Sequence, residues 1–127
     1  MTTLGARLLS VVPGEVTIEL PWHERLGQQH GVLHAGAVAS IADSACGYAA
    51  LSLMPPGAAV MSVEFKINLL APGRGDRFVA LGRVRRSGRT LTVCESTVRA
   101  MQGDEEREIA MVTATMIRLE DRPDLAD

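Results

Sequence analysis

The residue that stands out chemically is a carboxylate, Asp43, inside a stretch of small and apolar residues. Apolar side chains recur there every three or four positions, the period of an α-helix that buries at least one face. A carboxylate that is buried without a partner costs several kcal/mol or takes up a proton. Asp43 is therefore either a structural acid with a partner or a candidate general base or nucleophile. The apolar positions of this stretch are Val38, Ile41, Ala42, Ala45, Ala49 and Leu53.

This pattern predicts a helix over residues 36–54, which ends where two prolines and a glycine follow, because proline cannot continue a helix. Before it, residues 15–20 alternate between polar and apolar side chains, as in a strand with one solvated face. Residues 22–33 read as a loop with one short helical turn. After the helix, four segments rich in Val, Thr, Ile, Leu and Ala predict a meander of four long antiparallel strands. The segments are residues 60–70, 77–86, 91–101 and 109–119, with a hairpin at residues 87–89 and wider loops at residues 71–73 and 102–104.

This order of elements predicts an α+β fold, in which a curved antiparallel sheet wraps around one long central helix. The helix is rich in alanine and glycine, so other segments can pack closely against more than one of its sides. The chain has 127 residues, enough for one core but not for two. We expect a single domain over residues 1–127, with its core at about residues 14–119 and a polar tail at residues 120–127.

Composition argues against several classes of function. The net charge is −2 and only 3% of the residues are aromatic, so neither a basic surface nor stacking platforms for nucleic acid are expected. No segment has the length of a membrane span or the pattern of a signal peptide, which makes the cytoplasm the expected location. Cys46 and Cys94 fall inside the predicted helix and a predicted strand and are expected to be buried and reduced. His30 and His34 have no further ligands nearby in the sequence, so no metal site is expected.

Residues 31–36, which read Gly-Val-Leu-His-Ala-Gly, and the acid that follows resemble a motif of the hotdog-fold thioesterases. The resemblance is strongest to the branch related to phenylacetic-acid-pathway acyl-CoA thioesterases. That motif has Asn or Gln, five residues, His-Gly-Gly, and an acid nine residues after the histidine, and Ala35 stands in place of its first glycine. Residues 62–65 and 70–72 resemble the family's later strand and proline turn, so the resemblance covers about residues 14–119. The residues that match the motif are Gln28, His34, Gly36 and Asp43.

The resemblance implies hydrolysis of an acyl- or aryl-CoA thioester, with no cofactor because coenzyme A is part of the substrate. In the family, the backbone N–H at the position of Ala35, beside Gly36 at the start of the helix, polarises the thioester carbonyl. Asp43 acts as general base or nucleophile, while Ser62 and Gln28 hold the water, the carboxylate or the carbonyl. At ~1.5 Å per residue, the acid lies about 11–12 Å along the helix from those donors, so it has to come from a neighbouring subunit. The resemblance thus implies a homodimer with shared sites, and a tetramer built as a dimer of dimers.

Some of these residues also have a plainer interpretation. His34 either caps the helix or contacts the substrate. Glu64 lies two residues after Ser62 and is expected on the same face of the strand, where it binds substrate or is simply solvated. Arg89 and Thr90 belong to a turn that resembles the one approaching the nucleotide phosphates of coenzyme A, although a run of arginines is also typical of a solvated strand end.

Two other classes of function remain open from the sequence. A hotdog hydratase or dehydratase also uses a carboxylate on an acyl thioester, but its signature loops, Phe-Pro-Gly or Asn-Pro-x-His, do not occur near the helix. A non-catalytic acyl-CoA-binding module gains nothing from a carboxylate set against an apolar acyl chain. The binding module predicts that coenzyme A esters bind to the protein but release no free thiol.

Overall fold

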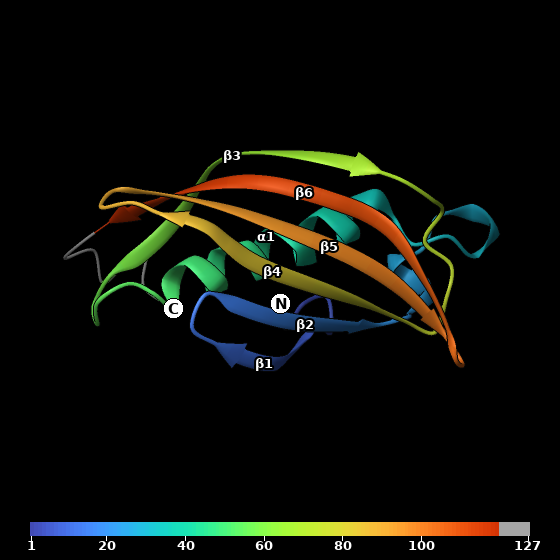
Figure 1. The fold of residues 1–127 in the computed structure, drawn as a ribbon. Coiled ribbons are helices and arrows are strands. Elements are labelled where there is room, and N and C mark those ends of the chain that lie inside the picture. The colour runs from blue at the N-terminus through green and yellow to red at the C-terminus, as the bar shows by residue number, and fades with distance from the viewer. Residues whose placement is uncertain (120–127) are drawn as a thin grey trace.

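An antiparallel sheet curves around one long helix, α1 (Ala35–Leu51). The computed structural model describes residues 1–119, and the predicted polar tail, residues 120–127, lies outside the described residues. In Figure 1 the strands arch over α1, with β3 along one edge of the sheet and β1 along the other. The strands are β1 (Arg7–Val12), β2 (Glu15–Pro21), β3 (Ala59–Leu69), β4 (Arg77–Ser87), β5 (Leu91–Gln102) and β6 (Glu105–Leu119), and two 3-10 turns, η1 (Glu24–Leu26) and η2 (Gln29–Gly31), precede α1.

The strand order across the sheet is β1-β2-β4-β5-β6-β3, which corrects the predicted meander of four consecutive strands. Strands β4, β5 and β6 do follow one another as hairpins, but β3 pairs with β6 and not with β4. The prediction is wrong because alternation along a strand indicates which face it buries and not which strand lies beside it. As a result, one edge of β3 has no neighbouring strand within residues 1–119, and its backbone can pair with another strand.

Strand β1 and the β5–β6 turn also differ from the expectation. The sequence pattern does not indicate β1, because all six of its residues are exposed and apolar side chains point to both faces. Two residues connect β5 to β6 in place of the expected wider loop, and Gly103 adopts φ 58° there. Glycine takes this left-handed conformation without steric cost, which permits the tight hairpin.

Helix α1 ends at Leu51, before the predicted end at residue 54. The Ser52 hydroxyl donates a hydrogen bond to the Ala49 carbonyl at 2.6 Å and accepts one from the Gly14 N–H at 2.8 Å. A serine side chain bonded in this way competes with the helix for backbone groups. Ser52 therefore ends α1 ahead of the prolines and ties it to the turn between β1 and β2.

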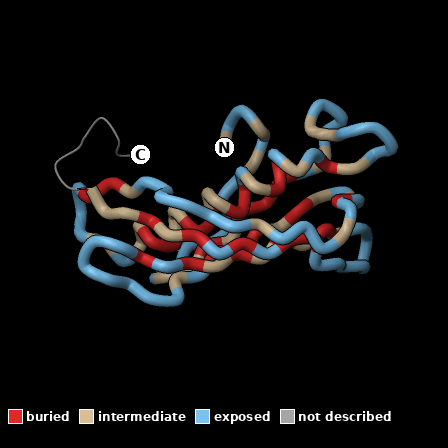
Figure 2. Tube along the Cα trace, turned by 90° about the horizontal axis from the view of Figure 1, so that it is seen from above, coloured by how far each residue is buried: buried red, intermediate tan, exposed pale blue. Residues whose placement is uncertain are grey.

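The core lies between α1 and the concave face of the sheet. Along β5 buried residues alternate with exposed or half-buried ones, and Figure 2 shows this alternation along the strands. A Cβ at Gly82 of β4 would lie 2.4 Å from the backbone of Ala45, so β4 and α1 touch backbone to backbone. The opposite side of α1 is exposed or half-buried and carries small or polar residues: Gly36, Ser40, Asp43, Ser44 and Gly47.

Candidate active site

Asp43 lies on this uncovered side of α1 and is half-buried. The hydroxyl of Ser62 in β3 donates a hydrogen bond to Asp43 Oδ1 at 2.8 Å. The same hydroxyl lies 3.3 Å from the sulfur of Met116, a buried residue of β6. With Val60 and Tyr48, these residues line a cavity of about 160 Å³. Among residues 1–119, Ser62 is the one hydrogen-bond partner of Asp43, so the second carboxylate oxygen is available to a water or a substrate.

A β-bulge follows Ser62 and separates it from Glu64. Ser62 pairs with Met116, whereas Glu64 pairs with Thr115, so two steps along β3 match one step along β6. Because Val63 is the extra residue of the bulge, Glu64 points to the opposite face of the sheet. Its Oε1 accepts a hydrogen bond from Thr115 Oγ1 at 2.6 Å. The expectation that Glu64 shares the face of Ser62 is therefore wrong.

In the first turn of α1, one backbone N–H group has no acceptor among residues 1–119. His34 is the N-cap residue, and its Nδ1 accepts a hydrogen bond from the Gly36 N–H at 2.9 Å. The N–H groups of Ala37 and Val38 donate to the His34 carbonyl at 2.9 and 3.2 Å. Within the described part of the chain no acceptor bonds the Ala35 N–H, so it remains a free donor at the positive end of the helix dipole. His34 thus caps the helix, and the Gly36 N–H is already used in the hydrogen bond to its imidazole.

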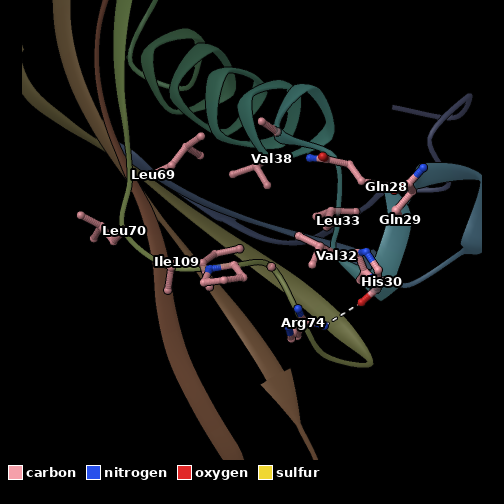
Figure 3. A pocket seen from close by; sticks show the side chains of 14 residues that line it. Gln28, Gln29, His30, Val32, Leu33, Val38, Leu69, Leu70, Arg74 and Ile109 are labelled. Atoms are coloured by element: carbon pink, nitrogen blue, oxygen red, sulfur yellow. Dashed lines mark hydrogen bonds between the residues drawn. The ribbon is translucent and has the colours of Figure 1, made fainter.

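A second cavity, of about 570 Å³, opens at the start of α1 (Figure 3). Gln28 and Ala35 line it, whereas Asp43 and Ser62 line the smaller cavity. Eight residues at ~1.5 Å each place Asp43 about 12 Å along the helix from Ala35. One protomer therefore separates the predicted site into two parts: a donor half with Gln28 and Ala35, and an acid half with Asp43 and Ser62.

Arg74 is a residue of the donor half that sequence reasoning did not single out. It lines the larger cavity and donates Nη1 to the His30 carbonyl at 2.7 Å. The two residues are 44 positions apart in the chain, so no local pattern predicts their contact. The sequence feature nearest to Arg74 is Pro72, which indicates a turn but does not indicate the contact with His30.

Arg89 and Thr90 lie in the exposed hairpin between β4 and β5. Next to this hairpin, Leu91 pairs with Ile117 of β6, and Ile117 pairs with Met61 of β3. Met61 adjoins the acid half, so the hairpin lies at the same end of the sheet as that half. Two arginines of β4 form ion pairs with neighbouring strands, Arg83 with Glu15 at 3.2 Å and Arg85 with Glu95 at 3.6 Å.

The two cysteines lie in the core and line neither cavity of the site. Cys46 and Cys94 are fully buried and free, as predicted. The Cys94 thiol donates a hydrogen bond to the Cys46 carbonyl at 3.5 Å. A hydrogen bond with the Cys94 side chain, together with burial, raises the pKa of the Cys46 thiol. Because the thiolate is the reactive form of cysteine, Cys46 is not a competing nucleophile beside Asp43.

Within residues 1–119, no group of three or more His, Cys, Asp or Glu side chains lies close enough together to hold a metal ion. In the same part of the chain, no helix is long and apolar enough to cross a membrane.

Over most of its length, the chain is similar to thioesterases and esterases. Residues 30–107 match the family model of the thioesterase superfamily. A presumed esterase of Halobacterium salinarum is 35% identical over 103 residues, which make up 77% of this chain and 68% of that protein. The crystal structure of a thioesterase family protein from Silicibacter pomeroyi is 52% identical, with a TM-score of 0.93 over 94% of this chain and 88% of that one. The PaaI protein from the phenylacetic acid degradation operon of E. coli is 24% identical and shares the fold, with a TM-score of 0.83 over 93% of this chain and 84% of that one.

Proposed function

Since the chain belongs to the thioesterase superfamily, we propose that it hydrolyses an acyl- or aryl-CoA thioester to the free acid and coenzyme A in a site that two copies of the chain share. Membership of the superfamily supports a hydrolase that acts on thioesters. The coenzyme A ester, the residue roles and the shared site are our proposal. The observation that carries it is the half-buried Asp43 carboxylate with the Ser62 hydroxyl 2.8 Å from Oδ1.

Asp43 promotes attack on the thioester carbonyl carbon in one of two ways. As general base it takes a proton from a water molecule, whose oxygen then bonds to the carbonyl carbon. As nucleophile its own oxygen bonds to that carbon and gives a mixed anhydride, which water hydrolyses. In both routes the C–S bond breaks and coenzyme A leaves as a thiolate that takes up a proton. Ser62 holds the carboxylate in position throughout.

The donor half stabilises the charge that develops on the carbonyl oxygen. The Ala35 N–H is free to donate to that oxygen, and the dipole of α1 adds to its effect. A donor that is already in place when the oxyanion forms lowers the barrier more than one that has to reorient. Gln28 lines the same cavity and orients the carbonyl.

Strand β3 supplies the surface on which the second copy joins. It begins beside the acid half, where Val60 and Ser62 line the smaller cavity, and ends at Leu69, which lines the larger one. A two-fold axis pairs such an edge strand antiparallel with its own copy, so the start of one β3 faces the end of the other. The acid half of one chain then meets the donor half of its partner. Apolar side chains exposed on β3 are buried by the same contact: Met61, Val63, Phe65 and Leu69.

The proposal is tested by incubating the purified protein with acyl- and aryl-CoA thioesters of different size and following free thiol with a chromogenic disulfide reagent. We expect thiol release from at least one ester, at a rate proportional to enzyme concentration and with one free acid formed per thiol. Enzyme without substrate is the control for the two cysteines, which are fully buried and should react slowly. Thiol release at the spontaneous rate with every ester would contradict the proposal.

A further inference from the structure

We propose that the contact between Arg74 and the His30 carbonyl forms the far wall of the acyl pocket and sets the longest acyl group that the protein accepts. The pocket is the cavity of about 570 Å³ at the start of α1. The inference rests on the proposed function only for placing the thioester carbonyl at Ala35. It adds that the preferred substrates carry apolar acyl groups of limited length.

The lining of the pocket indicates the chemical class of the acyl group. Its apolar side chains are aliphatic, and among the described residues no Asp or Glu lines it. A cationic acyl group would therefore lose its hydration there without finding a counter-ion, whereas a hydrocarbon group would gain free energy from burial. The larger aliphatic residues are Val32, Leu33, Val38, Leu69, Leu70 and Ile109.

Two loops border the pocket and are bonded to each other at two points. The Leu33 N–H donates to the Gly73 carbonyl at 2.8 Å, and Arg74 Nη1 donates to the His30 carbonyl at 2.7 Å. A Cβ on Gly73 would lie 3.1 Å from the Cβ of Leu33, so the loops are in contact at the first point. In Figure 3, Val38 and Leu69 lie beside α1, and the Arg74–His30 bond lies across the pocket from that helix.

The backbone at His30 adopts an uncommon conformation beside the Arg74 contact. His30 has φ 68° and Gly31 has φ 73°, so two successive residues are left-handed. That conformation is common for glycine but carries a cost for histidine. The surrounding contacts have to maintain such a conformation, and the Arg74 bond holds the carbonyl of the strained residue.

The test measures the binding of S-alkyl-CoA thioethers of increasing chain length by calorimetry. These analogues cannot be hydrolysed, so the result does not depend on whether the protein is a thioesterase. For the unmodified protein we expect affinity to rise about fourfold per added methylene, as about 0.8 kcal/mol per CH₂ implies, and then to fall at a defined length. In Arg74→Ala we expect the affinity to drop only at longer chains. The shortest chain that the unmodified protein rejects should bind to Arg74→Ala about tenfold more tightly than to the unmodified protein.

Two further variants make the test specific. Val32→Phe adds volume to the loop before α1, which lines the same pocket. The chain length at which affinity drops should therefore become shorter. Arg25→Ala, at an exposed arginine outside the pocket lining, should leave the fall where it is, and thermal melting checks that each variant is folded. An unchanged cut-off in Arg74→Ala would overturn the proposal, as would a failure of the unmodified protein to bind any analogue. A loss of equal factor at every length would also overturn it, because it would identify Arg74 as a contact for the phosphates of coenzyme A.

Discussion

Replacing Asp43 with asparagine should lower kcat on the best thioester substrate by about 10²-fold or more, while leaving the fold and the binding of substrate nearly unchanged. Asparagine has the same shape, and its Oδ1 can still accept the hydrogen bond that Ser62 donates at 2.8 Å. It cannot take a proton from water or form an anhydride. Steady-state thiol release, together with the affinity for an S-alkyl-CoA thioether, measures the two effects separately.

Asp104→Asn is the matched control, because Asp104 lies in the exposed β5–β6 hairpin, outside both cavities of the site. It should turn over as the unmodified protein does. If Asp43 is instead a structural acid, Asp43→Asn should lower Tm and leave the kcat of the folded protein unchanged. That result would remove Asp43 from the mechanism.

Ala35→Pro should lower kcat by about 10²-fold to 10³-fold, the loss expected when one oxyanion donor is removed. Proline deletes a single N–H group, which in residues 1–119 has no acceptor. It is also well suited to this position, because Ala35 is the first residue of α1 and His34 before it is extended, with ψ 136°. Proline is favoured at the first helical position and requires an extended residue before it. Thermal melting should therefore show a Tm near that of the unmodified protein.

Ala35→Gly is the control for this substitution. Glycine keeps the N–H group and stands at this position in the motif that the sequence resembles, so we expect kcat to stay within about threefold of the unmodified protein. The variant should also fold, since one helical Gly for Ala costs only about 1 kcal/mol of stability. Full turnover by Ala35→Pro would show that the oxyanion donor lies elsewhere.

Much of the fold follows from local patterns in the sequence. The hotdog fold is confirmed by the sheet around α1 and by its similarity to solved thioesterase structures. It could be predicted because α1 has a regular apolar period and because the strands after it alternate and are separated by turns. The candidate residues could be named for a different reason, since Gln28, His34 and Asp43 sit at the spacing of a recognisable motif.

Other features depend on contacts between distant residues, which no local pattern records. The place of β3 beside β6, which leaves its other edge unpaired within residues 1–119, is set by the whole sheet. One extra residue at Val63 reverses the face of Glu64, and a bulge of this kind has no strong signal in a single sequence. The Arg74–His30 contact joins two loops that are 44 residues apart. None of these features can be read from the alternation of polar and apolar residues along the sequence.

The central claim is that each active site takes its acid from one chain and its oxyanion donor from the other, and mixing two inactive variants tests it most directly. Asp43→Asn and Ala35→Pro chains, each with a different affinity tag, are unfolded together, refolded and purified through both tags. A mixed dimer then has one site with both groups intact and one with neither, so we expect about half of the unmodified kcat per dimer. Mixed dimers as inactive as the two parents would contradict a shared site, because a site within one chain would lack one group in every protomer.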